Sequence, residues 1–322
     1  MKSSFSKIQW HGLSDPKSVS NSVMELSDLY ISEEGSPVIW DNEHLVQAYL
    51  NYFLPLNTFR TLAILEWLNE VGFTNLFDEI VEFGSGPGTF QIAAHHSGYK
   101  WKWTCLEASA KAQKIHQEHA KTFGMSQPDF TKVWPTRSQS LFTSSYVLNE
   151  TELPTEAFSY DHILIIEPST QNASRKLMEL RSKLIDRGYH IWAPCTHMQA
   201  CPLLENSKKD WCHFRVHWDQ PEWFQKLEEE LPIKNRTLTV SYLAASKVKP
   251  ENTKERPARV IGDTLNEKGK VRQALCRGDQ REFMSWLKRF GEASPYPSGE
   301  LIDLPESITI KGNELRMNMP HE

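Results

Sequence analysis

The sequence Ile80-Val81-Glu82-Phe83-Gly84-Ser85-Gly86-Pro87-Gly88-Thr89 is a short apolar run that ends in three closely spaced glycines. The apolar run predicts a buried strand. The glycines let the backbone turn sharply and approach a ligand without interference from a Cβ atom. A strand, a glycine-rich turn and the start of a helix, in this order, indicate a nucleotide-type site at the carboxyl end of the first strand of an α/β sheet.

The segments around this stretch alternate between strand and helix patterns. The predicted strands are the short apolar runs Ile80–Phe83, Trp101–Leu106, Ser140–Leu148, His162–Ile166 and His190–Ala193. The predicted helices are the amphipathic segments Thr89–His96, Lys111–Phe123 and Ser174–Asp186. This alternation predicts βαβ crossovers and an α/β fold with a mostly parallel sheet covered on both faces.

Two regions flank this alternation. From Asp41 to Val71, apolar residues recur every three or four positions, which predicts two helices broken near Pro55. We assign no chemistry to this helical region from the sequence. Beyond Pro194 the pattern changes to a Cys- and His-rich segment, a strand at Thr239–Ala245 and short strand-like runs at Arg259–Ile261 and Ser307–Lys311.

These patterns divide the chain into four parts. They are a helical N-terminal region (1–76), a Rossmann-like core (77–194), a Cys-rich, basic region that includes the last core strands (195–290) and a β-rich C-terminal tail (291–322).

Composition restricts the class of protein. The chain has 322 residues, of which 39% are hydrophobic and 24% charged, so it can form a sizeable core and is not disordered throughout. The apolar runs are too short for a membrane-spanning helix, so we expect no membrane partner. The first residues, Met1 to Phe5, do not have the pattern of a signal peptide. We therefore expect a cytoplasmic protein of bacterial type, with the mitochondrial matrix as the alternative.

The charge is unevenly distributed. Residues 231–290 contain 14 Lys and Arg but only six Asp and Glu, although the whole chain has a net charge of −5. A basic region in an acidic protein is a candidate surface for the phosphates of a nucleic acid. The alternative is an ordinary solvated surface whose charges pair with one another.

The glycine spacing restricts the ligand. Gly88 comes two positions after Gly86, whereas the dinucleotide fingerprint has its third glycine three positions after the second. Glu82 before the loop and Glu107 after the next strand suit a cationic ligand with an amino group and a ribose diol, and S-adenosylmethionine has both. We expect Glu82 to hold the ammonium group and Glu107 the ribose hydroxyls. Two alternatives are an NAD-type site and glycines that serve only a tight turn.

Four of the five cysteines form a candidate metal-ligand set, consisting of Cys195, Cys201, Cys212 and Cys276. Zinc and iron–sulfur clusters are both commonly held by four cysteines, so the number of ligands does not distinguish them. His197 and His213 lie beside these cysteines and could replace one of them as a ligand. The alternative is that all four are ordinary core residues.

Several unusual motifs follow one another along the chain, and they resemble those of the mitochondrial small-ribosomal-subunit methyltransferase-like assembly factors and their bacterial relatives. The resemblance runs from about Tyr49 to Cys276. The motifs are Glu167-Pro168-Ser169-Thr170, Ala193-Pro194-Cys195-Thr196-His197, Cys201-Pro202-Leu203, Trp211-Cys212-His213-Phe214, Ser241-Tyr242-Leu243 and the distant Cys276. The chain departs from the family pattern at Ser169, at Thr196 and at Arg215-Val216-His217.

The resemblance implies a class I S-adenosylmethionine-dependent methyltransferase fold and binding to small-subunit ribosomal RNA in the assembling subunit. It also implies a [4Fe-4S] cluster on the four cysteines, with zinc as the alternative. The methyl-donor site would consist of Glu82, Gly84, Ser85, Gly86, Gly88, Thr89 and Glu107.

The sequence identifies no definite catalytic residue. The segment after the predicted fourth strand lacks the Asp/Asn-Pro-Pro-aromatic motif of many nucleic-acid amino-methyltransferases. The weak candidates are Asn149, Glu150 and Glu167, and each could instead cap a helix. Three functions therefore stay open: a ribosomal RNA methyltransferase, a non-catalytic assembly factor that binds the donor, and a small-molecule methyltransferase with a structural zinc.

Overall fold

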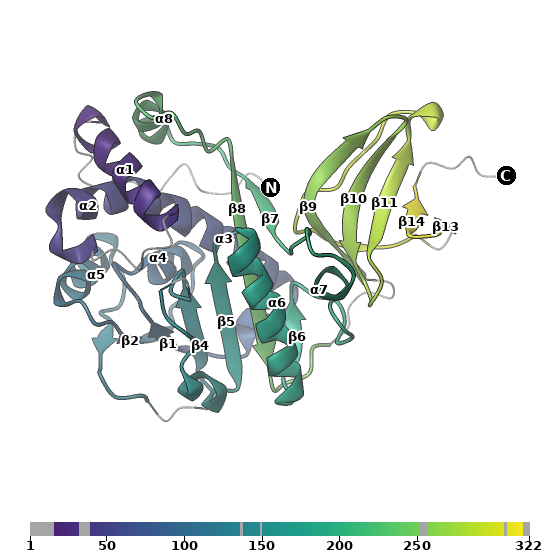
Figure 1. The fold of residues 1–322 in the computed structure, drawn as a ribbon. Coiled ribbons are helices and arrows are strands. Elements are labelled where there is room, and N and C mark those ends of the chain that lie inside the picture. Colours follow the sequence, from purple (N-terminus) through teal and green to yellow (C-terminus); the bar gives the residue numbers. More distant parts are fainter. Residues whose placement is uncertain are drawn as a thin grey trace. The chain divides into compact units, whose positions relative to one another are not determined.

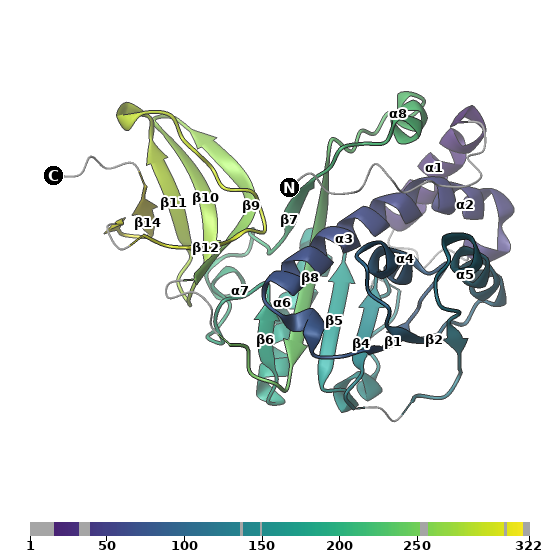
Figure 2. The same cartoon turned by 180° about the vertical axis from the view of Figure 1, so that it is seen from behind.

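The computed structural model describes residues 16–31, 39–135, 138–148, 150–251, 257–305 and 308–317. They divide into two compact units, shown from opposite sides in Figures 1 and 2. The first unit comprises Met1–Glu66, Phe77–Tyr160 and His217–Leu238, and the second comprises Trp67–Leu76, Asp161–Val216 and Thr239–Glu322. Each unit is described by itself.

Helices form the N-terminal part of the first unit. They are α1 (Pro16–Ile31), the 3-10 turn η2 (Ile39–Asp41), α2 (Glu43–Ala48), the π-helical turn η3 (Tyr49–Phe53) and α3 (Leu54–Glu70). The two helices predicted between Asp41 and Val71 correspond to α2 and α3, joined through η3. The predicted break near Pro55 is wrong, because Ala48, Tyr49 and Leu54 all have helical dihedral angles and the helical backbone continues through η3 into α3. Pro55, which has no N–H to donate, follows the π-helical turn directly.

A parallel sheet forms the rest of the first unit, in the order β3-β2-β1-β4. The strands of this sheet are β1 (Glu79–Phe83), β2 (Lys102–Leu106), β3 (Asp129–Phe130) and β4 (Leu141–Ser145). The helices of this part of the unit are α4 (Thr89–His96), α5 (Ala110–Phe123), η5 (Thr155–Ser159) and α8 (Glu222–Glu229). Helices α4 and α5 pack side by side, as Figure 2 shows. Because the strands are parallel, the carboxyl ends of β1, β2 and β4 lie at one edge of the sheet.

The second unit contains two groups of strands. In the first group, β5 (His162–Glu167) and β6 (His190–Ala193) both pair antiparallel with β8 (Thr237–Ser246), and β7 (Phe214–His217) also pairs with β8. Helix α6 (Gln171–Asp186) packs against β5 and β6. All six residues of β5 are buried, which explains the apolar run Ile163–Ile166 at its centre. The remaining helices of this part are η4 (Phe73–Asn75) and α7 (Pro202–Asn206).

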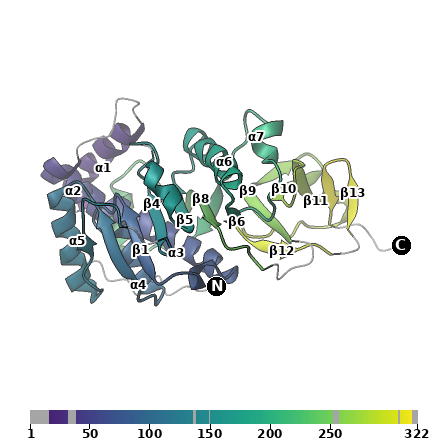
Figure 3. The same ribbon diagram turned by 90° about the horizontal axis from the view of Figure 1, so that it is seen from below.

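The second group is a six-stranded sheet in the order β12-β9-β10-β11-β14-β13. Its elements are β9 (Pro257–Glu267), β10 (Lys270–Cys276), β11 (Glu282–Leu287), η6 (Lys288–Phe290), β12 (Leu301–Asp303), β13 (Thr309–Lys311) and β14 (Glu314–Arg316). In Figure 3, β12 lies beside β9, with which it pairs antiparallel. Trp286, Ile302 and Leu315 share one buried cluster, so the C-terminal strands belong to the same core as β9–β11.

Among the residues described, no helix combines the length and apolar character needed to cross a lipid bilayer.

Candidate functional site

The outer two glycines of the loop are required by the packing of the protein itself. Both have positive φ, 69° at Gly84 and 90° at Gly88. A Cβ atom at Gly84 would lie 2.5 Å from a methyl carbon of Val147, and one at Gly88 would lie 2.2 Å from Cδ2 of His116. These distances are far below van der Waals contact, so any side chain at either position would displace a neighbour.

Gly86 differs from the other two glycines. Its φ is 50°, and a Cβ atom there would have Cζ2 of Trp40 at 3.6 Å, an ordinary contact distance. The Gly86 N–H donates to Oε2 of Glu107 at 2.8 Å, and the Ser109 N–H donates to Oε1 at 2.8 Å. Glu107 therefore ties the loop to the end of β2. A carboxylate offers about four acceptor positions, so it can still accept hydrogen bonds from a ligand.

Glu82 is a buried carboxyl group that could form an ion pair with a cationic ligand. It lies in β1, it is 1% exposed, and its Oε2 has no hydrogen-bond partner in the described structure. Burial, followed by repulsion from Glu107, raises the pKa of Glu82 well above its ordinary value. The buried Ser85, which follows β1, forms a hydrogen bond with the Cys105 thiol. Ser144 adds a buried hydroxyl at the end of β4 that has no hydrogen-bond partner in the described structure. Unsatisfied buried groups of this kind are typical of sites that a ligand completes.

A pair of histidines on α5 supports the loop. His119 Nδ1–H donates to the Pro87 carbonyl at 2.8 Å, and His116 Nε2 lies 2.6 Å from Gln91 Oε1. Gln91 donates its amide to Ser126 O at 2.8 Å, so its Oε1 accepts from His116. Burial lowers the pKa of His116 to about 3, which keeps this ring neutral. Spacing of three residues on a helix places both rings on one face, but the sequence does not show what they contact.

The catalytic candidates stay predictions. Asn149 lies outside the described residues. Glu150 is exposed in the turn after β4, and Glu167 is the buried last residue of β5, in the second unit. Tyr146, which the sequence did not single out, has φ of 63°, a conformation that is costly for a bulky residue and is found at functional sites.

The four predicted cysteine ligands come together in the second unit. Cys195 follows β6, Cys201 precedes the first turn of α7, Cys212 precedes β7 and Cys276 ends β10. All four line one pocket, together with Arg181 of α6. Residues up to 81 positions apart in the sequence thus meet at one place.

The pocket favours at least one ionised thiol. Arg181 Nε donates to Cys195 Sγ at 3.2 Å. A hydrogen bond from Cys276, followed by the charge of Arg181, lowers the pKa of Cys195 to about 6, while the same contact and burial raise the pKa of Cys276. These contacts favour the thiolate form of Cys195, which is the form that binds metals.

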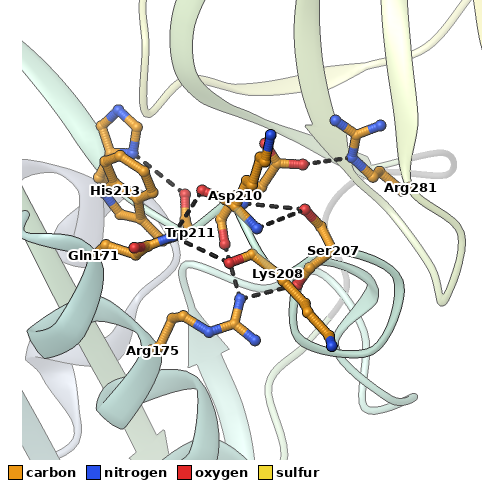
Figure 4. Close-up of polar contacts among 9 residues, drawn as sticks. Gln171, Arg175, Ser207, Lys208, Asp210, Trp211, His213 and Arg281 are labelled. Carbon is orange, nitrogen blue, oxygen red and sulfur yellow. Dashed lines mark hydrogen bonds and ion pairs between the residues drawn. The ribbon is translucent and has the colours of Figure 1, made fainter.

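Polar contacts fix the loop that carries Cys212, as Figure 4 shows. Arg175 of α6 donates to the carbonyls of Ser207 and Asp210, both at 3.0 Å. Arg281 donates to Oδ2 of Asp210 at 2.6 Å. The loop is therefore held by charged side chains from α6 and from the residue that precedes β11.

The cysteine set does not have the geometry of a single-ion site. Within the described ranges, no group of three or more His, Cys, Asp or Glu side chains is arranged to hold one metal ion. The two histidines proposed as alternative ligands are absent from the pocket lining. His197 Nε2 lies 3.3 Å from Cys276 Sγ, and His213 Nδ1 lies 3.2 Å from the Trp211 carbonyl.

The basic region is largely neutralised within the second unit. Arg259, which the charge count treats as surface, is 1% exposed and donates to the carbonyls of Pro194 and Gly299. Ion pairs occupy further residues of this region, namely Lys247–Asp161, Lys270–Glu314, Arg272–Glu267, Arg277–Glu282 and Arg281–Asp210. Lys254 and Arg256 lie outside the described residues. The basic stretch is therefore not a continuous free basic face.

The strand order, the glycine loop and the carboxylates beside it define the class of the chain as a Rossmann-like class I methyltransferase fold, here with a helical N-terminal region and a β-rich C-terminal part. The chain belongs to the Rsm22 family, because the model of that family, described as mitochondrial small ribosomal subunit Rsm22, matches residues 45–293.

Other comparisons give distant similarities. No curated protein matches the chain. Magnesium protoporphyrin IX methyltransferase from Synechocystis PCC 6803, solved with bound SAM, has 14% identity and a TM-score of 0.37, covering 74% of this chain and 100% of its own. A SAM-dependent methyltransferase from Aquifex aeolicus has 12% identity and a TM-score of 0.35, covering 60% and 92%. At these values the fold assignment depends on the strands described above.

Proposed function

We propose that the chain binds S-adenosylmethionine at the glycine loop and small-subunit ribosomal RNA during assembly of the subunit, and that its four cysteines hold a [4Fe-4S] cluster. Membership of the Rsm22 family supports the ribosomal partner. The observation that carries the donor site is the environment of Gly86. Of the three loop glycines, Gly86 is the one at which an added Cβ atom would make only an ordinary van der Waals contact. The carboxylates of Glu82 and Glu107 belong to the same site.

The residues of the loop have distinct roles in this proposal. The free side of Gly86 lets the donor approach the backbone. Glu82 forms an ion pair with the ammonium group of the donor and thereby gains the partner that its Oε2 lacks. Glu107 accepts from the ribose hydroxyls with the lone pairs that Gly86 and Ser109 leave free. The buried hydroxyl of Ser85 and Thr89, the first residue of α4, complete the site.

We expect Glu82→Gln to weaken donor binding about 30-fold, the value of one charge-assisted hydrogen bond of about 2 kcal/mol. The same change should stabilise the protein without donor. Because the pKa of Glu82 is raised in the folded protein, ionisation above its ordinary value of 4.5 favours the unfolded chain. The free energy of unfolding of the wild type therefore falls relative to the Gln variant as the pH rises past that value.

Calorimetric titration with the donor and urea unfolding at several pH values check both parts of this prediction. Glu79→Gln, at the partly buried start of the same strand, is the matched control. Wild-type donor affinity in Glu82→Gln would exclude the proposed ion pair. A stability difference that does not grow with pH would exclude a buried ionisable Glu82.

The proposal of a cluster rests on the pocket that the four cysteines share. In a [4Fe-4S] cluster each cysteine binds a different iron, so the four sulfurs stand farther apart than around one ion. The four cysteines line one pocket and supply four thiols for such a cluster. Cys195, Cys201, Cys212 and Cys276 would hold the cluster, and the Arg181 guanidinium would offset part of its negative charge. The alternative is a zinc ion, and analysis of the iron, sulfide and zinc content of the protein distinguishes it from the cluster.

A small basic patch is the best RNA-facing surface of the second unit. It consists of Lys268, Lys288, Arg289 and Phe290, all exposed. The Lys288 N–H donates to the Gly269 carbonyl at 3.0 Å, which joins η6 to the β9–β10 turn. The Arg289 guanidinium lies 4.6 Å from the centre of the Phe290 ring. Cations beside an exposed aromatic ring suit RNA phosphates and unstacked bases.

We expect the triple variant Lys268→Glu, Lys288→Glu and Arg289→Glu to bind a small-subunit ribosomal RNA transcript more weakly. The slope of log affinity against log salt concentration should also be less steep by about two to three. Filter binding over a range of salt concentrations measures both effects. The control replaces three exposed lysines of the first unit, Lys102, Lys114 and Lys226, with Glu. An equal loss in the control would show that net charge, and not this patch, determines RNA binding.

Methyl transfer is a separate question from binding. A bound donor needs mainly a nucleophile held in line with its methyl group, so the site described is compatible with catalysis. Incubation of the protein with donor labelled in the methyl group and immature small subunits distinguishes the two cases. Label in the extracted RNA supports a ribosomal RNA methyltransferase. Tight donor binding with unlabelled RNA supports an assembly factor that binds the donor without transferring the methyl group.

A further inference from the structure

Two aromatic side chains of the N-terminal helices lie beside the glycine loop. Trp40 belongs to η2, and its Cζ2 stands 3.6 Å from the Cβ position of Gly86. Tyr49 is the first residue of η3, and its ring meets that of Trp40 edge to face, with centroids 5.5 Å apart. The N-terminal region, to which the sequence assigned no chemistry, therefore supplies one side of the donor site.

The Tyr49 ring is held in place from three directions. Its hydroxyl forms side-chain hydrogen bonds with Thr89, at the start of α4, and with Asn57 of α3. Its ring stacks on Phe53 at 6.2 Å. Tyr49 lies in a π-helical turn, and such turns occur frequently at functional sites. A ring fixed in this way keeps Trp40 in a defined position beside Gly86.

The electrostatics of this side of the site favour a cation. Burial raises the pKa of Tyr49 to about 12, and the charges of Glu150 and Glu107 contribute to the shift. Tyr49 is therefore a neutral aromatic ring near two carboxylates, with Glu82 buried close to the same loop. Aromatic rings have a negative face that attracts cations, and the attraction is strongest for Trp.

We propose that Trp40, supported by Tyr49, forms an aromatic wall that faces the sulfonium group of the donor and makes the site prefer S-adenosylmethionine to S-adenosylhomocysteine. The first ligand carries a positive charge on sulfur, whereas the second, a neutral thioether, does not. An aromatic wall therefore discriminates between two ligands that differ only in the methyl group on sulfur and in the positive charge that it brings. This inference rests on the proposed donor site and adds to it a residue that determines its specificity.

Calorimetric titration of the full chain with each of the two ligands tests the proposal. For Trp40→Leu we expect about tenfold weaker binding of S-adenosylmethionine and less than about twofold weaker binding of S-adenosylhomocysteine. Trp40→Phe, which keeps an aromatic face, should retain most of the preference. Trp223→Leu in α8 is the control for loss of an aromatic side chain elsewhere in the first unit.

The outcomes separate this inference from the proposed function. If Trp40→Leu weakens both ligands equally, Trp40 has only a packing role and the inference is wrong. Unchanged affinity for both ligands would also overturn it. If the wild-type protein binds neither ligand, the proposed donor site itself fails. Thermal melting of each variant shows whether it remains folded, and Trp40→Phe serves as the milder substitution if Trp40→Leu does not.

Discussion

Gly86→Val is expected to abolish donor binding while leaving the protein folded. A Cβ atom at this position has Trp40 Cζ2 at 3.6 Å, so the side chain enters the space that the donor needs without striking the core. The φ of 50° strains a β-branched residue by about 1–2 kcal/mol, a cost that a domain of ordinary stability tolerates. Calorimetry should show an affinity reduced by a factor of at least about 100.

Gly88→Ala is the contrasting variant. Its Cβ would lie 2.2 Å from the ring of the fully buried His116, at φ of 90°, so we expect a strongly lowered melting temperature. The two substitutions thus separate a glycine required by a ligand from one required by packing. Wild-type donor affinity in Gly86→Val would show that the ligand does not approach the loop at Gly86.

Cys201→Ser is expected to lose the metal centre and to destabilise the second unit by several kcal/mol. The cysteines join segments that follow β6, precede α7 and β7 and end β10, so the binding energy of a metal centre here is also folding energy. Iron, sulfide and zinc analysis together with thermal melting measure the effect, on protein purified without oxygen. Cys105→Ser is the control, because Cys105 is buried in β2 of the first unit and should not affect metal content.

The metal content of the wild type decides between the candidate centres. Iron with matching sulfide supports the cluster, and zinc alone would make the cysteines a structural zinc site. Cys201→Ser protein with the metal content and melting temperature of the wild type would contradict the assignment of Cys201 as a ligand.

The sheets show which strands can be predicted from the sequence. His190–Ala193 was predicted with its exact bounds, because its apolar residues are contiguous and mostly buried. The run predicted at Arg259–Ile261 is in fact β9, Pro257–Glu267. Its first half is buried and its second half is mostly exposed, so the apolar pattern is confined to the first half of the strand.

Some residues of the candidate sites can likewise be predicted from the sequence, and others cannot. The glycine loop is a local motif, and its ligand-facing role could be inferred from residue types in a row. Trp40 and Arg181 could not be predicted, because long-range packing alone brings them to the loop and to the cysteine pocket. Arg259 is one of the 14 basic residues counted between 231 and 290, a stretch that the sequence suggests as a surface. It is buried because its guanidinium can donate to the carbonyls of two separate segments, a role that the charge count does not reveal.

Sedimentation of the protein with small ribosomal subunits in the presence of labelled S-adenosylmethionine tests donor binding and ribosome association together. We predict that the wild-type chain migrates with the small subunit and brings one labelled donor per chain. Gly86→Val should migrate with the subunit and bring no label. A wild-type chain that stays at the top of the gradient, or that reaches the subunit without donor, would contradict the proposed function.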